Sequence, residues 1–228
     1  MHQARRNHLI VTLSILLTIS ACSSSVKKWE DRIEASNTRD LELLLDSIYN
    51  QDQRYRRQLE DVRTKYGYES KELENLWKII EYTDSCNMAI VSIILDKKGW
   101  LGINDIGYRA NSALFLVIQH ASLDTQLKYL PMMRDAAEKG NAQKSSLAML
   151  EDRVALARGE KQIYGSQIGR NPNTGEYYVL PLIDPDNVNS RRIKMGMSKL
   201  ESYVEVYGIV WDVEAYKKQL PQLERELK

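Results

Sequence analysis

Apolar residues recur at helical spacing in five successive segments of the chain, and most of these segments begin at a capping residue and end near a glycine. Residues three and four positions apart share one face of an α-helix, so each segment predicts an amphipathic helix with one face to bury. The predicted helices run from Asn37 to Tyr66, Ser70 to Lys98, Asn104 or Asp105 to His120, Asp124 to Gly140 and about Leu147 to Ala157. Pro131 is expected to kink or tighten the fourth.

The pattern changes after Gly159. Residues 162–168 and 176–183 are short runs of aromatic and β-branched residues that flank a polar, glycine-containing stretch, which is typical of a β-hairpin. A short helix around residues 188–195 and a tail of one or two helices from Ser198 follow. The expected fold class is α+β, mainly α: a bundle of about five helices with one β-hairpin and a helical C-terminal tail.

The N-terminus has the features of a secretory signal. Arg5 and Arg6 precede an apolar run from Leu9 to Ile19, which is too short to span a membrane as a helix. The run ends at Ile19-Ser20-Ala21-Cys22, which resembles the bacterial lipobox and implies cleavage after Ala21 and a lipid on Cys22. We therefore expect a signal peptide over 1–21, a lipidated cysteine with a tether over 22–36 and a single helical domain over 37–228. An ordinary secretory signal with a chance cysteine is the alternative.

This leader predicts a protein of the cell envelope, anchored through lipid with its domain outside the cytoplasm. Ser23 stands where an inner-membrane retention signal would place Asp, so the outer membrane is favoured in a Gram-negative cell. Two or three acyl chains would hold the protein firmly.

Composition excludes several function classes. Losing residues 1–21 removes Arg5 and Arg6, which leaves 30 Lys and Arg side chains against 31 Asp and Glu and makes nucleic acid an unexpected partner. His120 would be the only histidine left, and Cys86 would have no partner once Cys22 carries lipid. Zinc sites built from several histidines or from cysteine pairs are excluded, and we expect neither a metal nor a cofactor. No phosphate-binding glycine loop, nucleophile elbow or HExxH motif is present.

Polar residues interrupt the apolar faces of four predicted helices. They are Asp52, Asp84 with Asn87, His120 and Asp152. A buried carboxylate needs a partner, and the available cations are Arg56, Arg153, Arg191 and Arg192. The residues could converge on one polar pocket, or they could belong to separate structural networks. In the first case His120 could act as a general base, with Asp52, Asp84 or Asp152 orienting its ring.

A second polar group lies at the start of the predicted hairpin. Gln162, Tyr164 and Gln167 place two amides and a phenol in one short segment, which suits a sugar or a peptide backbone and suits turn stabilisation equally well. Arg191 could bind a carboxylate or phosphate, although Asp184 and Asp186 make an internal ion pair the stronger expectation.

The order of motifs is also informative. It comprises Asp52-Gln53 with Arg56, Asn87, Gly99-Trp100, Gly107, Gln119-His120-Ala121, Asp152-Arg153, the Gln162 to Gln167 segment, and Arg191-Arg192 with Gly196. This set resembles the uncharacterised bacterial domain-of-unknown-function family 6624 over about 41–203. Leu101 and Ser166 depart from the residues that the family often has there, and neither departure removes a charged group. The resemblance implies no specific activity, but it singles out the same polar positions.

Two functions remain open at this stage. The first is a lipid-anchored envelope protein that binds a polar ligand, a sugar or a peptide, or an envelope protein partner. The second is an envelope hydrolase that uses His120 with an aspartate. The hydrolase requires His120 to contact a carboxylate and to face a pocket that also contains Tyr164 or Gln167.

Overall fold

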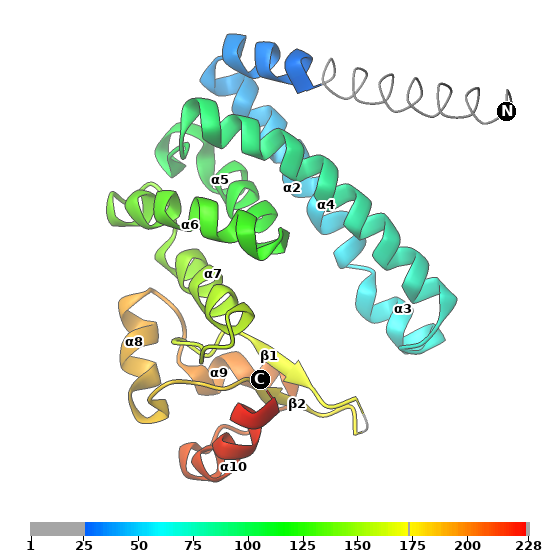
Figure 1. Ribbon diagram of the computed structural model, residues 1–228, viewed down its shortest axis with the longest axis vertical. Helices are drawn as coiled ribbons and strands as arrows, with labels where there is room; N and C mark the ends of the chain where they lie inside the picture. The colour runs from blue at the N-terminus through cyan, green and yellow to red at the C-terminus, as the bar shows by residue number, and fades with distance from the viewer. Residues whose placement is uncertain (1–25, 173, 227–228) are drawn as a thin grey trace, which may run out of the picture.

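A computed structural model describes residues 26–172 and 174–226 of the chain. Helices dominate these residues, and one two-stranded antiparallel hairpin accompanies them (Figure 1). The predicted class, α+β and mainly α, is confirmed.

After a helical stretch over residues 26–35, the helical part continues with α2 (Thr38–Arg56), α3 (Leu59–Tyr66), α4 (Lys71–Lys98), α5 (Ile103–His120), α6 (Leu123–Glu138) and α7 (Lys144–Ala157). Asn37 forms a capping box with Asp40 at the start of α2, and the Ser70 hydroxyl accepts from the Leu73 amide at the start of α4. These local hydrogen bonds explain why two of the predicted starts are correct.

Three details differ from the predictions. The segment predicted as the first helix forms two helices, because the chain turns at Arg57 and Gln58 between α2 and α3. The third begins after Gly102 rather than at Asn104 or Asp105, and Gly107 interrupts it with φ 74° and ψ 167°. These are backbone angles that glycine adopts at little cost, so α5 bends there without steric strain.

Helix α2 packs along α5 and α4, and α6 packs on α7 (Figure 1). Leu45, Ile94, Leu114 and Met133 are at most 1 % exposed in the core that these helices share. Trp77 of α4 is 38 % exposed, while neighbouring Leu76 is buried. The bundle is therefore held by a continuous apolar interior.

The C-terminal elements form a second, smaller core at the other end of the molecule (Figure 1). They are β1 (Ile168–Arg170), β2 (Tyr177–Val179), the 3-10 turn η1 (Pro185–Asn187), α8 (Val188–Lys194), α9 (Leu200–Val204), the 3-10 turn η2 (Glu205–Tyr207) and α10 (Val213–Glu226). The hairpin pairs Ile168 with Val179. Its strands are shorter than predicted, because Gly165 adopts φ 70° and the chain on either side of it forms a loop.

The N-terminal region is described only in part. The predicted signal peptide and Cys22 lie outside the described residues. The predicted tether to residue 36 differs from the structure from residue 26 onward, since residues 26–35 are helical and Ile33 is fully buried in the bundle core. Within 26–172 and 174–226, no helix combines the length and the apolar character that crossing a bilayer would require.

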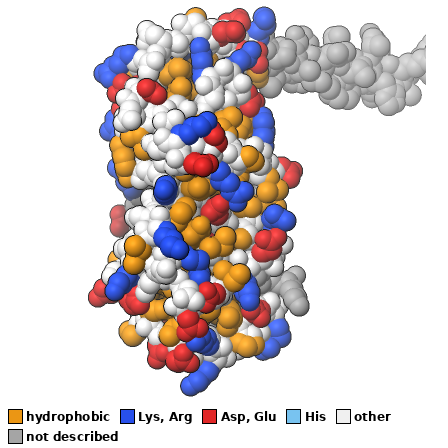
Figure 2. Space-filling model, turned by 90° about the vertical axis from the view of Figure 1, so that its left-hand side faces the viewer, with side chains coloured by type: hydrophobic (Ala, Val, Ile, Leu, Met, Phe, Trp, Pro, Cys, Tyr) orange, Lys and Arg blue, Asp and Glu red, His pale blue; other side chains and the backbone are white. Residues whose placement is uncertain are grey.

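One face of the molecule is seen in Figure 2. Positive and negative side chains alternate over this face with apolar patches between them, and no region of a single charge dominates the view.

Candidate functional site

Asp52 lies on the apolar face of α2 and is only 1 % exposed. Its Oδ1 is 3.0 Å from Nδ1 of His120, the last residue of α5, and its Oδ2 accepts a hydrogen bond of 2.8 Å from Gln53. Burial by itself would raise the pKa of Asp52, but the hydrogen bond and charge of His120, the charge of Arg56 and the Gln53 amide hold it below its usual value. Asp52 is thus an ionised carboxylate that orients the imidazole ring.

Arg56 connects this pair to α4. Its guanidinium donates two hydrogen bonds to the Asp84 carboxylate, at 2.9 and 2.7 Å, and a longer one of 3.4 Å to Oδ1 of Asp52. The two-pronged geometry is the strong form of an arginine–carboxylate pair. Helices α2, α4 and α5 therefore bring Asp52, Asp84 and His120 together, as the shared-pocket interpretation requires.

A cavity of about 570 Å³ opens beside His120. Helix α4 supplies one wall through Asp84 and Met88, and the start of α6 supplies another through Thr125 and Lys128. Tyr164 and Gln167 are not part of this cavity, so only the first half of the geometric requirement for a hydrolase is met. Nδ1 of His120 is used by Asp52, and among the described residues its Nε2 has no hydrogen-bond partner.

The same three residues have the donor types of a metal site. One ligand atom from each of Asp52, Asp84 and His120 lies within 4.8 Å of the others. However, Arg56 already donates to both carboxylates, and its fixed positive charge opposes a cation at this point. The positions of Asp52, Asp84, His120 and Arg56 are therefore those of an ion-pair network and not those of a metal centre.

Arg153 of α7 has no counter-ion among the described residues. It makes no ion pair or hydrogen bond within the described part of the chain, and its Nε is buried without a partner. Burial, together with the nearby charge of Arg56, lowers the pKa of Arg153. Two more buried polar atoms in this region lack partners among the described residues, Nδ2 of Asn87 and Oε1 of Gln119. Such groups cost free energy unless water or a ligand satisfies them.

Asp152 lies apart from the His120 cluster. Its carboxylate accepts hydrogen bonds from the backbone N–H groups of Ile163, Tyr164 and Ser166, at 2.6, 2.9 and 2.8 Å. Burial raises its pKa despite these donors. Asp152 therefore holds the loop after α7 and does not orient His120.

The candidate binding residues of the loop are also used internally. The Gln162 amide donates to the backbone oxygens of Gln167 and Leu180, and the Gln167 backbone N–H donates back to Gln162. The Tyr164 hydroxyl donates to Glu151, whose negative charge adds to burial in raising the pKa of Tyr164 to about 12. Of the two interpretations left open for this segment, the structure favours turn stabilisation.

The two consecutive arginines of α8 have different roles. Arg191 forms the expected ion pair with Asp184 at 3.1 Å and also donates to three backbone oxygens. Arg192 is 1 % exposed, and its guanidinium donates to the backbone oxygens of Ser198, Tyr164 and Gly165. Both arginines connect α8 to the loop that follows α7.

The structure thus divides the predicted site residues into two groups. Asp52, Arg56, Asp84 and His120 form the ion-pair network beside the His120 cavity, Arg153 lies near Arg56, and Asn87 is buried on α4 about one turn after Asp84. Asp152, Gln162, Tyr164, Gln167 and Arg191 hold the loop and α8. The sequence did not predict Gln53, which donates to Asp52, or Lys128, which lines the cavity, as site residues. Only Gln53 could have been suggested by the sequence, because it is the neighbour of Asp52.

Comparison with known proteins gives a family and no activity. The sequence model of a protein family, described as "Family of unknown function (DUF6624)", matches residues 39–215 of the chain. This range includes every residue of both groups. No curated protein and no solved structure matches the chain. The family match covers most of the chain, and the chain belongs to this family of unknown function.

Proposed function

We propose that this protein is a lipid-anchored hydrolase of the cell envelope, in which His120 is the general base and Asp52 orients it. Tyr164 and Gln167, which were expected in the same pocket, hold the loop after α7 instead and have no part in this proposal. The observation that carries the proposal is the 3.0 Å contact between Nδ1 of His120 and a buried, ionised aspartate, on a ring that lines an open cavity. Nε2 is then the nitrogen that can take a proton.

The chemistry that follows uses water as the nucleophile. None of the described serine or threonine hydroxyls hydrogen-bonds to Nε2 of His120, which argues against a covalent intermediate on this chain. Nε2 would remove a proton from a water molecule in the cavity, the water oxygen would attack the electrophilic centre of the substrate, and the proton would pass to the leaving group. Asp52 would stabilise the imidazolium that forms in between.

The proposal is tested by screening the full-length protein in detergent with p-nitrophenyl acetate, p-nitrophenyl phosphate, p-nitrophenyl glycosides and an aminoacyl p-nitroanilide. For any substrate turned over, we expect His120→Gln to lower kcat by about 100-fold or more, because general-base assistance is removed. Asp46→Asn is the matched control: Asp46 is also an ion-paired carboxylate of α2, but its partner is Arg109 and it lies outside the cavity. Turnover that survives in the His120→Gln variant would rule out the general base.

A second function is favoured by Arg153. A half-buried guanidinium without a counter-ion among the described residues is suited to an anionic group of a ligand, a carboxylate or a phosphate. In this case the protein would recognise its ligand without turning it over. Titration with inorganic phosphate and with acetate, comparing wild type with Arg153→Met, distinguishes the two: loss of binding with no turnover of any substrate supports recognition alone.

A further inference from the structure

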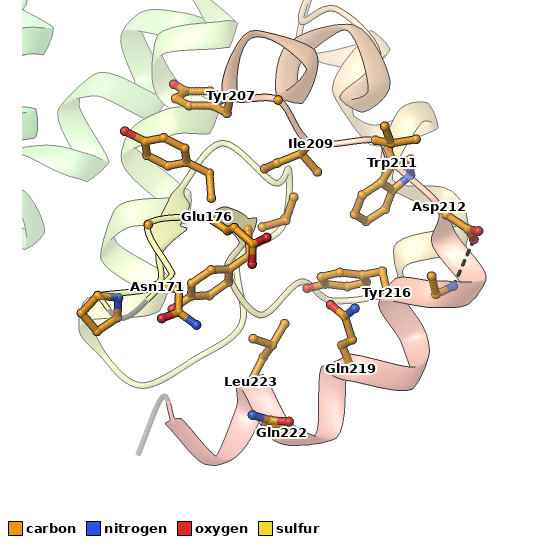
Figure 3. Close-up of a pocket in the computed structure, with 18 residues that line it drawn as sticks. Asn171, Glu176, Tyr207, Ile209, Trp211, Asp212, Tyr216, Gln219, Gln222 and Leu223 are labelled. Carbon is orange, nitrogen blue, oxygen red and sulfur yellow. Dashed lines mark hydrogen bonds between the residues drawn. The ribbon is translucent and has the colours of Figure 1, made fainter. Parts of the chain in front are cut away.

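A second cavity lies in the C-terminal part and shares no lining residue with the His120 cavity. It has a volume of about 1010 Å³. The hairpin forms one side, η2 and the segment after it form a second, and α10 forms the third (Figure 3). We refer to it as the hairpin cleft.

Aromatic rings cover much of the hairpin cleft. Tyr177 and Tyr207 form one pair, with ring centroids 5.6 Å apart, and Trp211 and Tyr216 form another at 4.9 Å. Tyr178 also lines the cleft. Figure 3 shows Trp211 and Tyr216 on the α10 side of the cleft and Tyr207 at its upper edge. Flat apolar surfaces on different sides of one cavity suit a ligand with flat apolar faces of its own.

The polar groups of the cleft are amides and carboxylates. Gln219 of α10 is exposed and makes no hydrogen bond within the described part of the chain, and Asn171 and Glu176 face it from the hairpin (Figure 3). Amides offer both donors and acceptors, as a ligand rich in hydroxyl groups requires. Among the described lining residues there is no Lys, Arg or His, so the cleft lacks the charge that attracts an anionic ligand.

Carboxylates next to aromatic rings could also suit a cationic peptide, but the charge available is small. Asp212 is already occupied, since its Oδ1 accepts hydrogen bonds from the backbone N–H groups of Glu214 and Ala215, at 2.9 and 3.0 Å. Glu176 uses one of its oxygens to accept from Thr174. Both carboxylates are exposed to water, which weakens an ion pair, so they are a weak basis for recognising a cation.

The cleft is also largely formed in advance. The Tyr216 hydroxyl donates to the backbone oxygen of Leu180 at 3.0 Å, which connects α10 to the chain after β2. Asp212 fixes the first turn of α10 through its two backbone contacts. Walls that are held in place lose little conformational entropy when a ligand binds.

We propose that the hairpin cleft is a binding site for a neutral oligosaccharide, with sugar rings packed on Trp211 and the tyrosines and hydroxyl groups bonded to the amides, Gln219 in particular. The C–H bonds of a sugar ring carry a small positive charge and pack well on the negative face of an aromatic ring. This site is separate from the one at His120 and does not depend on it.

The proposal is tested by titrating the full-length protein in detergent with triacetylchitotriose, cellotriose and maltotriose in a calorimeter. We expect saturable binding of at least one of them. Trp211→Leu should weaken it by at least about tenfold, and Gln219→Ala by about three- to tenfold through the loss of a hydrogen bond. Gln219 is exposed, so its variant tests the cleft even if Trp211→Leu unfolds the second core.

Two matched controls accompany these variants. Trp77→Leu removes a 38 % exposed tryptophan of α4, and Gln51→Ala removes an exposed glutamine of α2; neither should change the affinity. His120→Gln should bind the same sugar equally well, so failure of the hydrolase proposal and failure of this one give different results. No saturable binding of any trisaccharide up to about 10 mM overturns the proposal. Sugar binding that neither cleft variant weakens overturns it as well. So does binding of trilysine, titrated in the same way, when no sugar binds.

Discussion

At the scale of single residues, the informative contrast is between Asp52 and Arg192, which are buried charges with several partners, and Arg153, a half-buried charge with none among the described residues. Asp52 has His120, Arg56 and Gln53; Arg192 has three backbone oxygens; Arg153 has nothing within the described part of the chain. Replacing a buried charged side chain that has partners leaves those partner groups without a hydrogen bond and lowers the free energy of unfolding. Replacing a charged side chain without partners removes the free-energy penalty of its desolvation. The three residues should therefore respond differently to neutral substitutions.

Arg153 and Arg192 form a matched pair for this test. We expect Arg192→Met to lower the free energy of unfolding by about 2 to 4 kcal/mol, because the oxygens of Ser198 and Tyr164 lose a charged donor. Arg153→Met should leave stability within about 1 kcal/mol of wild type or raise it. Urea denaturation of both variants measures the difference. An equal loss in the two would show that Arg153 has a structural partner.

Asp52 predicts how stability depends on pH. Its pKa in the folded protein is held below that of the unfolded chain, which is about 3.9. A lowered acid pKa contributes stability that is complete above the unfolded value and is lost as the pH falls through the folded value. We therefore expect Asp52→Asn to be less stable than wild type by about 1 to 3 kcal/mol at pH 7, and the difference to shrink below about pH 4.

Urea denaturation at neutral and acidic pH measures this change. Asp46→Asn is again the control, because Asp46 makes its ion pair near the surface and its loss should cost little. A difference between wild type and Asp52→Asn that stays constant down to about pH 2 would contradict the ionised state assigned to Asp52.

At the scale of elements, the course of α5 decides where His120 lies. Gly107 lets the helix change direction near its start, and the remainder of α5 then packs on α2 and ends at the cavity. A side chain at φ 74° costs free energy even where space is free, and nothing lies within 4 Å of the position that a Cβ would take at Gly107.

We expect Gly107→Ala to lower the free energy of unfolding by about 1 to 2 kcal/mol, since alanine disfavours the left-handed backbone that glycine accepts. Asn104→Ala, an exposed change in the same first part of α5, should stay within about 0.5 kcal/mol. Thermal unfolding followed by circular dichroism compares the two. Equal stability of both variants would show that the bend is not required.

At the scale of the whole molecule, two apolar cores are joined through α7 and the loop after it. The bundle core contains the His120 cavity on its flank, and the smaller core forms the base of the hairpin cleft. The side chains of Asp152, Gln162 and the two arginines of α8 form their hydrogen bonds within this junction. The junction, rather than a ligand, explains why so many polar residues are found there.

The proposed anchor also belongs to this scale. If Cys22 carries the proposed lipid, Cys22→Ser should abolish incorporation of labelled palmitate and release the protein from the membrane fraction, because serine has no sulfur to acylate. Cys86→Ser is the control, since Cys86 is an exposed cysteine of α4. Equal labelling of wild type and the Cys22→Ser variant would contradict the anchor. Mass spectrometry of the mature N-terminus gives an independent measurement.

The helices were largely determined by the sequence itself, because apolar spacing and capping hydrogen bonds act within a few residues. Asn37, Ser70 and Gly99 delimit α2 and α4 as expected. The same local rules could not reveal the break at Arg57 and Gln58, where no residue signals it, and Gly107 alone did not predict the bend, since a helix can also tolerate a single glycine without changing direction.

Only the tertiary structure decided which polar residues meet. Asp52 and Asp152 look alike in sequence, as acids on apolar helical faces, yet one binds an imidazole ring and the other binds backbone N–H groups. The outcome depends on how α2, α4, α5 and α7 pack, and contacts between residues far apart in the chain leave no local pattern. For the same reason the hairpin cleft, built from three distant segments, could not be recognised before the chain was folded.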